Sequence, residues 1–204
     1  MEGNARERVL RAAERLFARR GFAGTSMRDL AKASGVSQAL IHHHFGTKRE
    51  LYNAVKERAV QQFLSLATSR TPAKVGSHWG SPLAQTELGE LWRWLLALFE
   101  FFRKNRRLVR LLSWERLEGK ARLWPAEKRL LEAFHSLATE LQRNGPLRRD
   151  LDPLMLIALL QSLVVAWWEN RPWVCRLFPR RQQQELDRMF VEHLSKLLSS
   201  GIRG

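Results

Sequence analysis

Cysteine is nearly absent from this chain, which has one such residue, Cys175, in 204 positions. A single cysteine excludes an intramolecular disulfide framework and a cysteine-rich zinc site, and it fits a reducing compartment. Long apolar runs are also missing, because the longest uncharged stretch is the sixteen residues 153–168. A membrane-spanning helix needs roughly 20 such residues, and the charged N-terminal stretch lacks the apolar core of a signal peptide. We therefore expect a cytoplasmic chain that does not act on a membrane and uses residues 153–168 in a core or subunit interface.

Motifs of catalysis and metal binding are absent as well. The sequence has no GxSxG, Walker A, GxGxxG or Cys-x-x-Cys pattern, and its glutamates are scattered singly. Three histidines do follow one another, at positions 42, 43 and 44. Successive helical residues point ~100° apart, so these three side chains cannot converge on one ion. The sequence predicts a protein that is not an enzyme and has neither a metal nor a cofactor.

Positive charge and aromatic rings are abundant. Lysine and arginine number 35 against 20 acidic residues, a net charge of +15, and apolar residues make up 45% with eight Trp and ten Phe. The chain can therefore bury a full core, and its charge favours an anionic partner such as nucleic acid, an acidic membrane surface or a phosphorylated molecule. Only a third of the excess positive charge lies in residues 1–52, which hold ten cations and five anions, and the other two thirds lie in residues 53–204.

The apolar pattern is helical throughout, with a period of 3.6 residues and no sustained alternation. Ser26 with Asp29, Ser37, Thr47 with Glu50, and Asp152 before Pro153 are start signals for helices. Thr68 to Gln85 is rich in Pro, Gly, Ser and Thr, so we expect a connector there. The predicted fold is all-α, with four helices before that connector and further helices near 86–104, 106–118, 125–144, 153–170 and 182–199.

Residues 25–45 predict a helix-turn-helix. Two short helices flank Gly35-Val36-Ser37, where glycine permits the positive φ of a tight turn and serine caps the second helix. The N-terminal end of that second helix is the part that reaches base edges in this motif. Any helical hairpin can supply such a match, so the motif by itself leaves the function open.

A longer segment, GFAGTSMRDLAKASGVSQALIHHHFGTKRELYNAV, resembles the DNA-binding domain of the TetR family of transcriptional regulators. The resemblance covers residues 5–55 and implies a three-helix DNA-binding domain over 1–52. A long helix would join it to an effector-binding and dimerisation domain over 53–204, giving nine to ten helices in all. The resemblance also implies a homodimer through helices near 153–170 and 182–199, which binds a double-stranded, pseudo-palindromic operator as a repressor.

Site residues follow from the same resemblance. Gln38, Ala39 and Leu40 occupy positions that touch base edges, and glutamine suits a bidentate contact with adenine. His42 stands where the family usually has a tyrosine that contacts phosphate, and His44 where it has Tyr or His. The predicted DNA-binding set is Thr25, Ser26, Arg28, Gln38, Ala39, Leu40, His42, His43, His44 and Lys48. Since a protonated imidazole donates two hydrogen bonds, we expect affinity for DNA to rise as pH falls from about 8 to 6.

The second domain is predicted to bind an apolar small molecule. Large aromatic residues recur on several of its helices and could wall an apolar cavity, although each one singly is more simply a packing residue. The predicted ligand-binding set is Trp92, Leu96, Phe99, Arg106, Trp114, Trp124, Phe134, Trp167 and Trp168. The basic run 103–110 is either a solvated face, a flank of the DNA interface or a phosphate-binding mouth that would suit an acyl-CoA.

One rival interpretation remains at the level of sequence. The charge alone would also fit a sequence-nonspecific architectural DNA-binding protein. The large aromatic second domain argues against it, because holding phosphates does not require that much buried surface. The ratio of operator affinity to random-DNA affinity separates the two interpretations.

Overall fold

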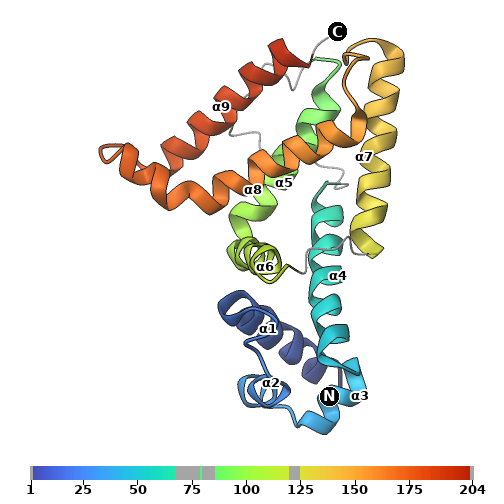
Figure 1. Ribbon diagram of the computed structural model, residues 1–204, viewed down its shortest axis with the longest axis vertical. Helices are drawn as coiled ribbons and strands as arrows, with labels where there is room; N and C mark the ends of the chain where they lie inside the picture. Colours follow the sequence, from blue (N-terminus) through green and yellow to red (C-terminus); the bar gives the residue numbers. More distant parts are fainter. Residues whose placement is uncertain (1, 68–78, 80–85, 120–124, 203–204) are drawn as a thin grey trace. The chain divides into compact units, whose positions relative to one another are not determined.

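The computed structural model describes residues 2–67, 79, 86–119 and 125–202, and within them it contains nine α-helices and no β-strand (Figure 1). The all-α prediction is confirmed. The helices are α1 (Glu2–Arg20), α2 (Met27–Ser34), α3 (Gln38–Phe45), α4 (Lys48–Ala67), α5 (Gly89–Lys104), α6 (Arg106–Leu117), α7 (Pro125–Asn144), α8 (Pro153–Leu177) and α9 (Gln183–Gly201).

Local capping explains where the predicted helices begin. The hydroxyl of Ser26 accepts a hydrogen bond from the Asp29 amide, and the Asp29 carboxylate accepts one in return from the Ser26 amide. Thr47 and Glu50 form the same reciprocal arrangement at the start of α4. Asp152 caps α8 through the Met155 amide, with Pro153 in the first turn. Each cap satisfies amide donors that a helix end leaves unpaired.

The contacts divide the chain into two compact units. The N-terminal unit consists of residues 1–62 and 105–127, and the C-terminal unit consists of residues 63–104 and 128–204. The first unit therefore contains α1 to α3, most of α4 and also α6, which follows α5 in the sequence. This division differs from the predicted functional boundary at residue 52, which stays a prediction.

In the N-terminal unit, α1 packs on α2 and α3 on one side and on α6 on another. Its core contains Phe17, Leu30, Ile41 and Leu51, each fully buried. The turn after α1 passes close beneath α6, and Gly21 has φ +71° there. A Cβ at Gly21 would lie 3.0 Å from the Trp114 ring and 2.3 Å from the Glu118 carboxylate, and residues with side chains rarely adopt this positive φ, so glycine is favoured there.

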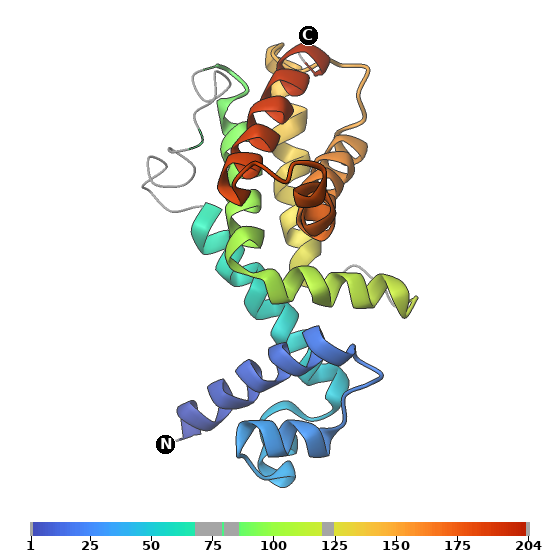
Figure 2. The same ribbon diagram turned by 90° about the vertical axis from the view of Figure 1, so that its left-hand side faces the viewer.

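In the C-terminal unit, α5 packs on α8, and α8 packs on α9 (Figure 2). One face of α5 presents Phe99, whose ring lies 4.7 Å from Trp168 on α8 and 5.7 Å from Phe190 on α9. The opposite face presents Trp94, whose ring lies 4.7 Å from Phe134 on α7. Aromatic packing on both faces of α5 thus forms the core of this unit.

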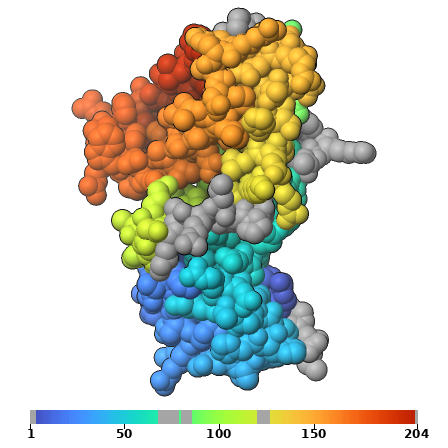
Figure 3. Space-filling view, turned by 45° about the vertical axis from the view of Figure 1, so that its right-hand side comes forward, coloured from blue at the N-terminus to red at the C-terminus, as the bar shows by residue number. Residues whose placement is uncertain are grey.

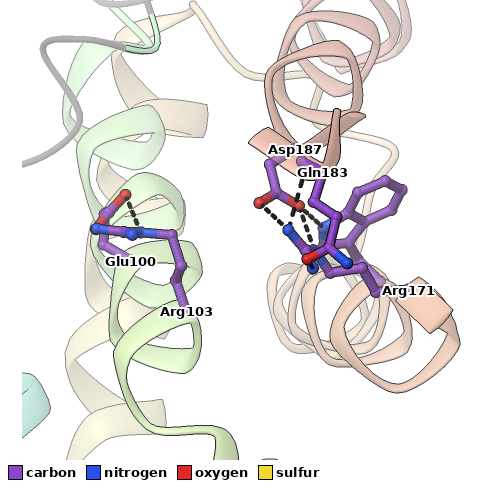
Figure 4. A network of polar contacts seen from close by, with 6 residues as sticks. Glu100, Arg103, Arg171, Gln183 and Asp187 are labelled. Carbon is purple, nitrogen blue, oxygen red and sulfur yellow. Dashed lines mark hydrogen bonds and ion pairs between the residues drawn. The ribbon is translucent and has the colours of Figure 1, made fainter. Parts of the chain in front are cut away.

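The structure extends α8 beyond its predicted end near residue 170, through Pro172 to Leu177. Proline removes one backbone hydrogen bond from a helix interior, so the sequence favoured an earlier end. Tertiary contacts support the extension. Arg171 donates to both carboxylate oxygens of Asp187 at 2.7 and 2.8 Å and to the Gln183 side chain at 2.6 Å, which fastens this part of α8 to α9 (Figure 4).

Among the described residues, α8 is the one helix long and apolar enough to span a membrane by length and composition. Its most apolar window is 33% buried. A helix that packs on two neighbours in a soluble protein passes the same test, so this result alone is weak evidence for a membrane span.

Candidate functional site

The exposed face of α3 is formed by four of the predicted DNA-binding residues. Gln38 and His42 lie one turn apart, as do Ala39 and His43, and all four are exposed. The opposite face buries Ile41 and Phe45 in the core of the N-terminal unit. Residues at a spacing of four share one face of a helix, so α3 presents one continuous polar face to solvent. Leu40 and His44 are half-buried at the edges of this face.

Arginine side chains from α1 hold the turn between α2 and α3. Arg8 donates through Nε and Nη2 to the Ser34 carbonyl at 3.0 and 2.7 Å, and through Nη2 to the Gly35 carbonyl at 2.8 Å. Arg15 donates to the Ala33 carbonyl at 3.3 Å. Gly35 has φ +64°, and a Cβ there would lie 2.6 Å from Arg8 Nη2. Sequence reasoning missed this role of the two arginines because their partners lie 18 to 27 residues away.

Three of the predicted DNA-binding residues make their polar contacts within the protein. Thr25 is 1% exposed, and its hydroxyl donates to the Gly21 carbonyl at 2.9 Å. Ser26 is exposed, but its hydroxyl is engaged in the cap of α2. The Lys48 ammonium donates to the carbonyls of Phe22 and Thr25 at 2.9 and 2.8 Å and lies 4.3 Å from the Phe22 ring centre. These groups fasten the segment before α2 to the start of α4, whereas Arg28 is exposed on α2.

Hydrogen bonding shifts the pKa of the two capping carboxyl groups. The hydroxyl and backbone amide of Ser26 lower the pKa of Asp29, and those of Thr47 lower the pKa of Glu50. Both carboxylates therefore stay ionised at the N-termini of α2 and α4, where negative charge is favoured. The pKa of Tyr52 is raised, first by burial and then by the Glu115 carboxylate.

A buried ion pair joins α4 to α6 inside the N-terminal unit. Lys56 Nζ lies 2.5 Å from Glu115 Oε1, and the two side chains are 5% and 7% exposed. Burial lowers the pKa of Lys56, which the neighbouring Glu115 carboxylate opposes. Glu118, just after α6, also accepts a hydrogen bond from the Ala23 amide at 3.1 Å. The segment that carries the turn after α1 is thus tied directly to α6.

The predicted ligand-binding residues divide between the two units. Trp92, Leu96, Phe99 and Trp168 are buried in the C-terminal unit, with Trp167 and Phe134 half-buried there. Arg106 and Trp114 belong to the N-terminal unit, where Trp114 packs beneath the Gly21 turn. Trp124 lies outside the described residues. Sequence reasoning did not include Ser195, which is 1% exposed and whose hydroxyl has no hydrogen-bond partner in the part of the chain that the structure describes.

In the basic run 103–110, the carboxylate contacts of Arg103 and Arg107 can be described. Arg103 Nη2 lies 2.9 Å from Glu100 in the C-terminal unit, and Arg107 lies 3.8 Å from Glu14 in the N-terminal unit. Figure 4 shows the first of these pairs on α5. The run is therefore shared between the two units. The described residues contain no cluster of metal-ligating side chains.

Comparison with known proteins identifies the family of this chain. Residues 9–55 match the family model described as bacterial regulatory proteins, tetR family. Residues 90–194, more than half of the chain, match the tetracyclin repressor-like C-terminal domain. The chain belongs to the TetR family. TetR-family proteins are transcriptional regulators with a helix-turn-helix and are not enzymes, so the predicted resemblance is confirmed.

Similar proteins agree with this assignment. The transcriptional repressor Rv3405c of Mycobacterium tuberculosis is 43% identical over 67 residues, which are 33% of this chain and 36% of that protein. The repressor AcnR of Corynebacterium glutamicum is 42% identical over 52 residues, 26% of this chain and 28% of that protein. Each match thus spans about a third or less of the length of these curated relatives.

Solved structures extend the similarity of the fold to the rest of the TetR-family chain. The putative regulator SCO4942 from Streptomyces coelicolor has a TM-score of 0.66 at 24% identity, covering 93% of this chain and 97% of its own. A putative TetR-family regulator from Shewanella has a TM-score of 0.70 at 16% identity, covering 98% of each chain. These similarities concern the arrangement of the helices.

Proposed function

We propose that this TetR-family chain is a ligand-responsive transcriptional repressor, which binds a pseudo-palindromic operator as a homodimer and is released by an apolar small molecule. The exposed face of α3 is the observation that carries the proposal. It presents Gln38, Ala39, His42 and His43 at the end of a helix-turn-helix whose turn is held by Arg8. A rigid helix with an exposed polar face is what reading base edges in a major groove requires.

In this proposal, the DNA-binding residues have two kinds of role. Gln38, Ala39 and Leu40 reach base edges, and exposed Arg28 contacts the phosphate backbone. Thr25 and Lys48 hold the segment that precedes α2, because their polar groups are already bonded to main-chain carbonyls. Gln38→Ala is expected to relax the preference for adenine at one position of each half-site, without a change in salt dependence.

The dimer is proposed on the apolar surface of α8. Met155, Leu159 and Leu163 repeat every four residues and are 59%, 55% and 46% exposed. Figure 3 shows α8, in orange, at the surface of the C-terminal unit beside α7, in yellow. A continuous apolar stripe of this kind on a soluble protein marks an interface. A second copy also supplies the second recognition helix that a pseudo-palindromic operator needs.

The effector is proposed to bind among the aromatic side chains of the C-terminal unit. Among the described residues, Trp92 Nε1 on α5 and Ser195 Oγ on α9 are buried donors without a hydrogen-bond partner. A buried donor left unpaired costs about 1–3 kcal/mol, which a ligand oxygen can recover. The proposed effector is therefore an apolar molecule that carries carbonyl, carboxylate or ether oxygens, and an acyl-CoA is one version of it.

Two measurements test the function. Selection of binding sites from random DNA is expected to return a palindrome, bound at least a thousandfold more tightly than random DNA at physiological salt. A ratio near one would instead favour an architectural DNA-binding protein. Calorimetric titration with fatty acids and with their CoA esters then tests the effector class, and only binding of the esters would implicate the basic run 103–110.

A further inference from the structure

The ring of His42 is held in place by the residue that ends its own helix. His42 Nδ1 lies 2.8 Å from the carbonyl oxygen of Gly46, and the Gly46 amide donates to the His42 carbonyl at 2.8 Å. Gly46 is itself constrained, because it has φ +69° and a Cβ there would lie 2.3 Å from the Glu50 carboxylate. Both polar groups of the Gly46 backbone therefore bond to His42.

This contact fixes which ring nitrogen carries the proton. A carbonyl oxygen only accepts hydrogen bonds, so Nδ1 must be the donor. A neutral imidazole has one N–H, which leaves Nε2 with a lone pair and no proton. Nε2 lies on the side of the ring away from Nδ1, and the side chain is exposed on the polar face of α3. Neutral His42 therefore offers DNA an acceptor.

An acceptor cannot pair with a phosphate, which has only acceptor oxygens. In the major groove, the hydrogen-bond donors are the exocyclic amino groups, N6 of adenine and N4 of cytosine. His42 lies one turn after Gln38 on the same exposed face, within reach of the groove that Gln38 would enter. We propose that His42 reads the amino group of an adenine or cytosine through Nε2, rather than contacting the DNA backbone, an inference that rests on the proposed DNA-binding function.

The free protein gives a first test that needs no DNA. Nitrogen-15 shifts of the histidine rings at pH 8 are expected to show His42 protonated at Nδ1 and unprotonated at Nε2. His135, which is exposed on α7, serves as the comparison for an unconstrained ring. A His42 ring protonated at Nε2 would overturn the proposal whatever the protein binds.

A second test pairs protein and DNA changes. Sites are selected with the wild-type protein, His42→Phe and the control His135→Phe, and affinities are measured over a range of salt. His42→Phe is expected to lose the preference for adenine or cytosine at one position of each half-site and to keep its salt slope. Replacing that base by 2-aminopurine, or by N4-methylcytosine, removes the major-groove N–H. Wild-type affinity should then fall roughly fivefold to tenfold, and His42→Phe affinity should stay unchanged.

The remaining outcomes distinguish failure of the His42 proposal from failure of the proposed repressor function. If the wild type selects a palindrome but His42→Phe keeps every base preference and lowers the salt slope by about one, His42 contacts a phosphate and the proposal is wrong. The proposal is equally wrong if neither quantity changes. If the wild type selects no sequence, the proposed repressor function fails together with it.

Discussion

At the scale of single residues, the Lys48 ammonium is bonded to two main-chain carbonyls and lies over the Phe22 ring. We expect Lys48→Met to lower the free energy of unfolding by about 1.5–3 kcal/mol, because hydrogen bonds from a charged donor are lost. Operator affinity should fall while the salt slope stays constant, since no phosphate contact is removed. Chemical denaturation and binding at several salt concentrations measure the two effects. A slope lower by about one at unchanged stability would instead assign Lys48 to a phosphate contact, in keeping with its place in the predicted DNA-binding set.

The two capping carboxylates give a pH dependence. Hydrogen bonds from Ser26 and Thr47 lower the pKa of Asp29 and Glu50 in the folded state below the unfolded values, near 4. Their contribution to stability is therefore complete above about pH 4 and is lost as pH falls through the lowered values. Denaturation should show that Asp29→Asn and Glu50→Gln have a lower free energy of unfolding than the wild type at pH 7. This deficit should shrink toward pH 3. Ser37→Ala removes an uncharged cap, so its deficit should be equal at both pH values.

The sequence predicts helix caps and tight turns well, because these features depend on residues that are neighbours in the chain. The caps Ser26, Ser37, Thr47 and Asp152 and the turn at Gly35 were predicted from neighbouring residues, and the structure has them all. The carbonyl contacts of Arg8 and Lys48 were not predicted, because their partners lie 23 to 27 residues away. The orientation of the His42 ring also depends on the three-dimensional path of the chain at Gly46, so the sequence indicated only a departure from the family pattern.

At the scale of helices, the assignment of α6 to the N-terminal unit depends on long-range packing. The sequence predicted α6 as a helix but could not place it on α1, since that contact joins segments about 95 residues apart, as Ala23 and Glu118 show. The same limit applies to the end of α8. Helix propensity favours an end before Pro172, whereas the contacts of Arg171 with α9 stabilise the longer helix.

The buried Lys56–Glu115 pair tests how α4 and α6 are joined. Lys56→Met should cost about 3–5 kcal/mol of stability, because it leaves the Glu115 carboxylate buried without its partner. The double variant with Glu115→Leu should recover most of this loss, since apolar residues can replace a buried ion pair. Lys196→Met, which breaks an exposed pair with Glu192, should change little. Urea denaturation measures the stability of all three variants. A double variant as unstable as Lys56→Met would contradict the idea that the loss comes from leaving Glu115 without its partner.

At the scale of the whole molecule, the proposed function requires a second copy of the chain. Leu159 is 55% exposed in the middle of the apolar stripe on α8, so replacing it leaves the core of one chain intact. Leu159→Glu would place a carboxylate inside the proposed interface without a partner, where desolvation strongly opposes the charge. We expect this variant to be monomeric by light scattering and to lose operator binding, with the helical content of the wild type.

Leu117 supplies the matched control for this experiment. It is 78% exposed at the end of α6 in the N-terminal unit and is not a member of the apolar stripe of α8, so Leu117→Glu adds the same charge to a residue outside that stripe. This variant is expected to remain dimeric and to bind the operator. A dimeric Leu159→Glu, or a wild type that is monomeric at micromolar concentration, would move the interface away from α8. Operator binding lost in both variants alike would point to added negative charge as the cause, because a chain of +15 approaches DNA through its positive field.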